Sequence, residues 1–91
     1  LSQELNNKKA TVFPNPISGN NFINIRLEGY ENNTPVLIQV VDVKGSMNKQ
    51  VSGNLLNGKF VLNTNVLSNG VNILKVIVKT ETFNFQIIKN D

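Results

Sequence analysis

The sequence predicts an all-β fold: a single immunoglobulin-like β-sandwich of about seven antiparallel strands. Apolar and polar residues alternate in short segments, turn residues separate these segments at spacings of about 8–12 residues, and no segment repeats its apolar residues with a helical period. The chain has 91 residues, of which 40% are hydrophobic, which is enough for one core and too few for a second. The Cys-Trp-Cys set of true immunoglobulin domains is absent, because the chain has neither Cys nor Trp.

Four strands are expected in the first half of the chain, at residues 10–13, 23–27, 36–43 and 47–51. Pro14 and Pro16 must end the first strand, because proline cannot donate a hydrogen bond to a strand ladder. The second strand shows the period-two alternation of a half-buried strand. Its apolar positions are Ile23, Ile25 and Leu27.

The third strand is the most apolar, and it is expected to turn back into the fourth through a hairpin at residues 42–45. Ile38 and Val40 should face the core and Gln39 the solvent, because side chains alternate across a strand. Gly45 is available for the positive φ that a tight hairpin turn requires.

Three further strands are expected at residues 60–64, 71–79 and 83–87. An Asn-Gly pair at residues 57–58 is a strong two-residue hairpin signal ahead of the first of them. In the middle strand, Lys75 and Lys79 mark the outer face, which places Leu74, Val76 and Val78 on the inner face. The last strand alternates in the same way, with apolar residues at Phe83, Phe85 and Ile87.

Residues 1–9 are polar and aperiodic, and we expect them to form the end of a linker from an upstream cargo domain. The folded domain is then expected over residues 10–91. The chain opens on Leu1 rather than Met, so we expect a piece cut from a longer protein. Its first residues do not have the composition of a signal peptide, and its apolar runs are too short to cross a bilayer.

The composition argues against an enzyme, a metal site or a bound cofactor. With no Cys and no His, the chain lacks a thiol nucleophile, thiolate ligands and the commonest general base. Its six acidic residues show no metal-ligand spacing. Glu28 and Glu31 straddle a turn, but without a supporting His we do not expect a glycosidase pair. Asp42 is expected to cap its turn rather than bind a metal.

The charge distribution gives no reason to expect nucleic-acid binding. The net charge of +3 comes from scattered basic residues, of which only Lys8 and Lys9 are adjacent, and aromatic residues make up 7%. A nucleic-acid site needs a clustered basic stripe with stacking aromatics. We expect a monomer that has no membrane-spanning segment.

Four short phrases, each readable as a strand beside a turn, follow one another along the chain. Thr-Val-Phe-Pro-Asn-Pro occupies residues 11–16, Val-Val-Asp-Val-Lys-Gly residues 40–45, Leu-Ser-Asn-Gly-Val-Asn-Ile-Leu-Lys-Val residues 67–76, and Phe-Gln-Ile-Ile-Lys residues 85–89. Singly, each phrase is explained by turn chemistry. Jointly, their order, spacing and position resemble the type A sorting domain of the type IX secretion system, the C-terminal module of many proteins exported by Bacteroidetes.

The resemblance covers residues 12–89, with three departures from the family pattern. The family's middle phrase typically has a Tyr before the Asp and a basic residue after the Gly, where this chain has Val41 and Ser46. Its third phrase has a Tyr where this chain has Asn72. A Tyr there can bury its ring and tie its hydroxyl to a loop, whereas Asn can do only the second.

The resemblance implies that the chain is an export label with its own fold. Domains of this family sit at the C-terminus of proteins that reach the periplasm through a separate N-terminal signal. The outer-membrane translocon recognises the folded domain and exports the cargo. A sortase-like transpeptidase then commonly cleaves near the start of the domain, and the cargo is joined to surface lipopolysaccharide or released.

The resemblance also indicates candidate site residues. The processing region is expected at Asn6, Asn7, Lys8 and Lys9. Translocon recognition is expected to use residues 71–89, whose edge backbone is available to pair with another strand. The candidate recognition residues are Pro14, Asn15, Pro16, Asp42, Gly45, Gly70, Lys75 and Lys89. Lys89 is expected at the exposed surface, while turn chemistry alone explains the two prolines as a stiff exit from their strand.

A generic β-sandwich accessory module, for carbohydrate binding or cell adhesion, is the alternative interpretation. Sugar binding usually needs exposed aromatic rings. Most of the aromatic residues fall on predicted core faces: Phe13, Phe22, Tyr30, Phe60, Phe83 and Phe85.

Overall fold

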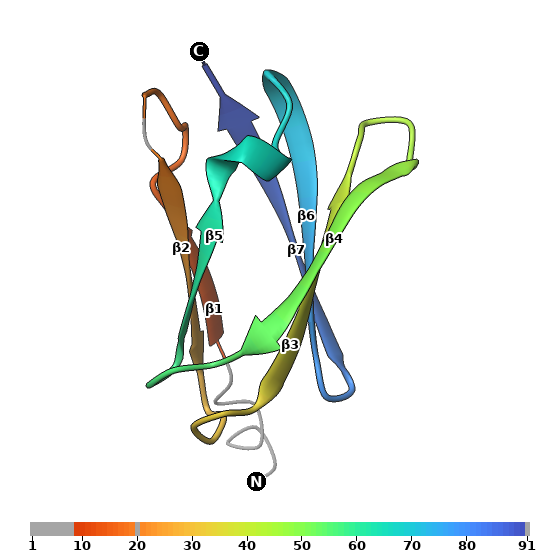
Figure 1. Cartoon of the computed structure of the whole chain (residues 1–91). Coiled ribbons are helices and arrows are strands. Elements are labelled where there is room, and N and C mark those ends of the chain that lie inside the picture. The colour runs from red at the N-terminus through yellow and green to blue at the C-terminus, as the bar shows by residue number, and fades with distance from the viewer. Residues whose placement is uncertain (1–8, 20, 91) are drawn as a thin grey trace, which may run out of the picture.

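The computed structural model describes residues 9–19 and 21–90, which form two antiparallel β-sheets facing each other (Figure 1). The three-stranded sheet has the order β1-β2-β5 and contains β1 (Lys9–Phe13), β2 (Phe22–Glu28) and β5 (Lys59–Asn63). The four-stranded sheet has the order β4-β3-β6-β7 and contains β3 (Pro35–Val41), β4 (Met47–Asn54), β6 (Gly70–Val78) and β7 (Glu81–Lys89). The predicted β-sandwich is confirmed.

The core lies between the two sheets and is formed by the inward-facing positions that the alternation predicted. Ile38, Val40, Leu74, Val76 and Val78 are all buried. Four aromatic rings pack against this core: Tyr30, Phe60, Phe83 and Phe85. The other two aromatic side chains, Phe13 and Phe22, are exposed on the three-stranded sheet.

The hairpin between β3 and β4 is held by Asp42, as its sequence predicted. The Asp42 carboxylate accepts hydrogen bonds from the backbone N–H groups of Lys44 and Ser46, both at 2.9 Å. Gly45 has a φ of 93°, a region that a residue with a side chain rarely adopts. The expected strand over residues 36–43 is too long by two residues, because this turn begins at Asp42 and β3 ends at Val41.

The predicted end of β4 is also wrong, since Gly53 and Asn54 continue the strand to its pairing with β3. Gly53 lies directly opposite Val36 in the register. The Phe60 ring of β5 occupies the space beside Gly53, and a Cβ atom built there would clash with that ring. Because glycine has no side chain, the Phe60 ring can lie between the two sheets. Gly53 therefore makes room for this ring and does not end β4.

A short 3₁₀ helix, η2 (Thr64–Val66), joins β5 to β6 and was not predicted. The expected strand over residues 60–64 ends one residue early because the Asn63 side chain accepts a hydrogen bond from the Asn65 N–H at 2.8 Å. Asn side chains compete with strand ladders in this way. Within residues 9–19 and 21–90, no helix has the length and apolar character that a membrane span requires.

Tyr30 ties the loop after β2 to the start of β7, because its hydroxyl donates a 2.8 Å hydrogen bond to the Glu81 carboxylate. Partial burial, this hydrogen bond and the negative charge of Glu81 raise the pKa of Tyr30 from 10.0 to about 12. Because the folded state holds the phenolic proton more tightly, its stabilisation is complete below pH 10 and is lost as the pH rises to about 12.

Tyr30→Phe is expected to lower the free energy of unfolding by about 1 kcal/mol at neutral pH, since it removes one side-chain hydrogen bond. Between pH 10 and 12, the wild-type protein should lose stability relative to this variant, so that the two unfolding curves converge. Urea denaturation at several pH values measures both effects. A constant difference between the two proteins up to pH 12 would contradict the assignment of the raised pKa to Tyr30.

Candidate functional site

Three of the four phrases meet at the end of β7. The first contact comes from Asn15, in the loop after β1. Its side-chain amide donates to the Gln86 carbonyl at 2.9 Å and accepts from the Ile88 N–H at 3.2 Å. Donating and accepting on the outer edge of β7, the Asn15 amide occupies the place that a peptide group of a neighbouring strand would take.

Ile17 continues the same contact through its backbone. Its N–H donates to the Ile88 carbonyl and its carbonyl accepts from the Asn90 N–H, both at 2.7 Å. The Ile17 side chain is fully buried, which anchors the loop in the core. Asn15 and Ile17 together therefore close the outer edge of β7 from Gln86 to Asn90.

Lys89 makes the third contact. Its backbone lies between Gly70 of β6 and Ile17, and its ammonium group donates to the carbonyls of Thr64 at 3.1 Å and Leu67 at 3.3 Å. The side chain is half-buried. The expectation of an exposed Lys89 is therefore wrong: its long stem reaches back over η2, where the Thr64 carbonyl accepts from both the Leu67 N–H and the Lys89 ammonium group.

We refer to Asn15, Ile17, Thr64, Leu67 and Lys89 as the C-terminal clasp. Asn72 fixes the segment that follows Leu67, because its side chain is buried and makes three hydrogen bonds, two with Ser68 in the loop before β6 and one with Gly70 at the start of β6. It accepts from the Ser68 N–H at 3.0 Å and donates to the carbonyls of Ser68 at 2.8 Å and Gly70 at 3.3 Å. Asn72 thus makes the loop contact of which an Asn at this position is capable.

The other predicted site residues lie around the clasp or away from it. Pro14 and Pro16 flank Asn15, Gly70 pairs with Lys89, and the hairpin holding Asp42 and Gly45 lies at the same end of the four-stranded sheet (Figure 1). Lys75 lies at mid-sheet on the outer face, between Gln39 and Asn84 in the register. Lys9 begins β1 opposite Glu28, at the far end of that strand from the clasp, and Asn6, Asn7 and Lys8 fall outside the described residues.

Only part of the β7 edge remains open for pairing. The even-numbered residues from Gln86 onward direct their backbone groups away from β6. By the alternation of an antiparallel ladder, Thr82 and Asn84 do the same. Among the described residues, this stretch of β7 pairs only with β6. Strand pairing was expected along residues 71–89. Of the β7 edge in this range, the stretch Thr82–Gln86 remains open to pair with another strand.

An apolar pair lies on the outer face of the four-stranded sheet next to the clasp. Val71 and Ile88 are direct cross-strand neighbours, with 39% and 37% of their surfaces exposed. Met47, at the start of β4 on the same sheet, is 54% exposed. Exposed apolar side chains beside a rigid, hydrogen-bonded strand end are suited to contact with another protein.

Within residues 9–19 and 21–90, no three His, Cys, Asp or Glu side chains group closely enough to hold a metal ion. Every fully buried side-chain nitrogen or oxygen there has a hydrogen-bond partner. The site is thus built from strand edges, carbonyl groups and apolar side chains. The fold and the site together define a small β-sandwich module of the kind that recognises other proteins.

The family model described as the secretion system C-terminal sorting domain matches residues 11–90. The chain belongs to this family, the C-terminal sorting domains of the type IX secretion system. As such it acts as a sorting signal for export across the outer membrane, and it associates with the type IX machinery and a cargo. No curated protein matches the chain.

The sequence interpretation missed the residues that receive the end of β7. Ile17 was assigned to no element, although it is an apolar residue directly after a Pro-Asn-Pro run and before a polar loop, which is a signal for an anchored turn. Thr64 and Leu67 contribute only backbone carbonyls to Lys89. Because any residue supplies a carbonyl, nothing in their side chains could have indicated this role.

Proposed function

We propose that this domain is non-catalytic and directs an upstream cargo through the outer-membrane translocon by presenting the folded end of β7. One observation carries the proposal: three phrases that characterise the family converge on the C-terminal clasp. The family's phrases lie far apart along the chain, and their joint occurrence is explained if they build one surface. If the C-terminal residues were read as a disordered tail, the end of β7 would not need its contacts with Asn15 and Thr64.

In this proposal the clasp holds the recognition surface and neighbouring residues make the contact. Asn15 and Lys89 are positioning residues, since their polar side-chain groups already bond to carbonyl and N–H groups of this chain. Val71 and Ile88 offer the translocon an apolar pair, and Pro16 and Gly70 lie beside it. A rigid strand end has little conformational entropy to lose on binding, which favours affinity.

Processing belongs to the other end of the domain. We propose that the cargo enters the periplasm through its own signal and that a sortase-like transpeptidase later cleaves the linker within residues 1–9. Surface attachment or release then follows. Lys9 is separated from the clasp by the length of β1, so the described domain begins at the opposite end from the surface that the clasp holds. The domain is proposed to act as a monomer.

An export assay tests this function. The chain, fused behind a periplasmically targeted fluorescent protein in a type IX host, is expected to carry that protein to the cell surface or the medium. A reporter that stays in the periplasm with the domain folded and intact would refute the sorting role for this chain.

The recognition surface is tested in the same assay with two exposed apolar positions. Ile88→Asp is expected to leave the reporter in the periplasm, whereas Phe22→Asp, on the outer side of the other sheet, should be exported like the wild type. Both variants should unfold within a few degrees of the wild-type Tm, because surface substitutions cost little stability. Normal export of Ile88→Asp would place recognition elsewhere without affecting the sorting role.

A further inference from the structure

The chain contains two Asn-Gly pairs, Asn57–Gly58 and Asn69–Gly70. Asparagine is among the thermolabile residues. Its side-chain amide carbon, Cγ, can be attacked by the backbone nitrogen of the next residue. Glycine in the next position leaves this nitrogen unhindered, because it has no Cβ. Both asparagines are exposed, so exposure alone does not distinguish the two pairs.

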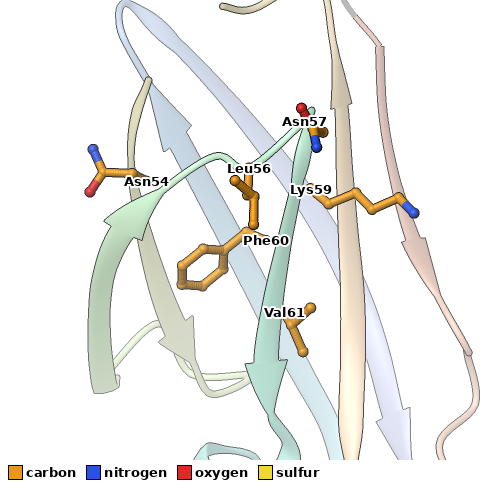
Figure 2. A pocket seen from close by; sticks show the side chains of 6 residues that line it. All are labelled: Asn54, Leu56, Asn57, Lys59, Phe60 and Val61. Carbon is orange, nitrogen blue, oxygen red and sulfur yellow. The ribbon is translucent and has the colours of Figure 1, made fainter. Parts of the chain in front are cut away.

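The backbone nitrogen that follows Asn57 is not engaged. Asn57 and Gly58 form the tip of a two-residue turn before β5, with positive φ values of 52° and 80°, as such a turn requires (Figure 2). Leu56 and Lys59, on either side, exchange two backbone hydrogen bonds at 2.9 and 3.1 Å. Among the described residues, none accepts a hydrogen bond from the Gly58 N–H or bonds to the Asn57 side-chain amide. The nucleophile and the carbon that it attacks are therefore both available.

The backbone nitrogen that follows Asn69 is held. Gly70 is the direct partner of Lys89 in the ladder of β6 and β7. The even-numbered residues of this part of β7 bond on the outer edge, so Lys89 directs its backbone groups toward β6. The Gly70 N–H is therefore bonded to the Lys89 carbonyl. Asn72 adds a further restraint, since its amide donates to the carbonyls of Ser68 and Gly70, on both sides of Asn69.

The two pairs also differ in what must open before the ring can close. At Asn57 the turn has to part the bonds between Leu56 and Lys59. In the part of the chain that the structure describes, this side of β5 pairs only with Leu56. At Asn69 the start of β6 has to leave β7, at the place where the C-terminal clasp holds Lys89. Opening a turn at a strand edge costs less free energy than opening a paired strand end that is held on both sides.

We propose that Asn57 is a deamidation site of the folded domain and that the fold suppresses the same reaction at Asn69. The Gly58 nitrogen loses its proton to a solvent base and bonds to Cγ of Asn57. The side-chain nitrogen leaves with a solvent proton as ammonia, which closes a succinimide ring. Water then opens the ring at one of its two carbonyl carbons. The inference is independent of the proposed sorting function.

The bond that water breaks decides the product at position 57. Cleavage between the Gly58 nitrogen and Cγ restores the main chain and gives aspartate. Cleavage between the Gly58 nitrogen and the backbone carbonyl carbon leaves the chain running through Cγ and gives isoaspartate. In both cases one amide and one water become one carboxylate and one ammonia.

Isoaspartate at position 57 would disturb the contacts that hold the start of β5. The Asn57 N–H donates to the Asn32 side-chain oxygen at 2.9 Å, and the Gly58 carbonyl accepts from the Leu27 N–H at 2.7 Å. Isoaspartate adds a methylene group to the main chain between these two bonds. A two-residue turn has a fixed length, so the lengthened turn cannot keep both contacts. We therefore expect the isoaspartate form to be less stable than the unmodified domain.

Incubation of the whole chain in mildly alkaline buffer tests the site, with peptide mapping by mass spectrometry at intervals. Conversion of amide to acid should be about tenfold or more faster at Asn57 than at Asn69, because the fold holds only the second nitrogen. In concentrated urea the two pairs should convert at similar rates, since unfolding frees both nitrogens. Equal conversion in the folded chain, faster conversion at Asn69, or conversion at Asn57 in urea alone would each overturn the proposal.

Amide hydrogen exchange, followed by NMR, tests the structural reason directly. The Gly58 N–H should exchange about tenfold or more faster than the Gly70 N–H, because only the second is bonded in a ladder. This measurement needs no chemical conversion and uses the unmodified protein. Equal exchange of the two N–H groups would remove the basis for the difference between the pairs.

The effect on stability is tested with the aged protein and with Asn57→Gly. Ion exchange separates the aged protein, and an isoaspartate-specific methyltransferase measures the isoaspartate in each fraction. Fractions rich in isoaspartate should melt about 4 °C or more below the unmodified protein, since the turn loses at least one hydrogen bond. Asn57→Gly tolerates the positive φ but has no side-chain amide, so its Tm should not change on ageing. An isoaspartate form that melts like the unmodified protein would contradict the expected effect.

Discussion

Deleting residues 86–91 is expected to abolish folding of the whole domain. The deletion removes Ile87, a fully buried core residue, and every β7 group that the C-terminal clasp holds. It also leaves the first residues of β6 without their partner strand. Loss of one large buried side chain costs about 2–5 kcal/mol, and a domain of this size has about 5–15 kcal/mol in total.

Circular dichroism on heating measures the effect: the truncated chain should show no cooperative transition, whereas the full chain should. The full-length variant Gln86→Ser is the matched control, since that side chain is exposed and its backbone carbonyl is kept. A cooperative melt of the truncated chain near the wild-type temperature would contradict the expectation. If the truncated chain does not fold, loss of secretion on truncation reflects the loss of the fold. The variant Ile88→Asp is then the one that tests recognition.

Lys89→Glu is the second large effect that we expect, at about 2–3 kcal/mol of lost stability. Two hydrogen bonds from a charged donor to the Thr64 and Leu67 carbonyls disappear, and a carboxylate is placed against those oxygens. Lys89→Met keeps the apolar stem and should cost about 1 kcal/mol, because the half-buried ammonium is partly replaced by water. Urea unfolding of both variants measures these differences.

Lys49→Glu, on an exposed position of β4, is the matched control and should change stability by less than about 0.5 kcal/mol. If Lys89→Glu unfolds at the same urea concentration as the wild type, the Lys89 contacts contribute nothing to the clasp. The same charge change at two lysines thus separates a general charge effect from a local one.

The strands and their inner faces were predictable because their signals are local. Ile38, Val40, Leu74, Val76 and Val78 occupy inward positions that the period-two pattern alone determines. The Asp42 turn and the Asn57–Gly58 turn follow from the conformations that these residues tolerate. Local chemistry and the final fold agree at these positions.

The candidate site was only half predictable. Asn15 and Lys89 were identified by resemblance, but their partners lie 71 and 25 residues away along the chain, and no local pattern connects them. Lys89 was expected at the surface because a terminal lysine usually is. Its burial depends on where η2 ends, and η2 itself depends on the Asn63 side chain, a competition that alternation does not reveal.

The C-terminal clasp also determines when the domain can become folded. Asn15 bonds to residues 71 and 73 positions further along, so closing the clasp requires a loop of nearly the whole domain. Contacts of such high sequence separation pay their loop entropy before they give any stabilisation, which makes folding slow for the size of the chain. A nascent domain therefore stays open until β7 has joined the sheet, and the surface at the end of β7 exists only after folding is complete.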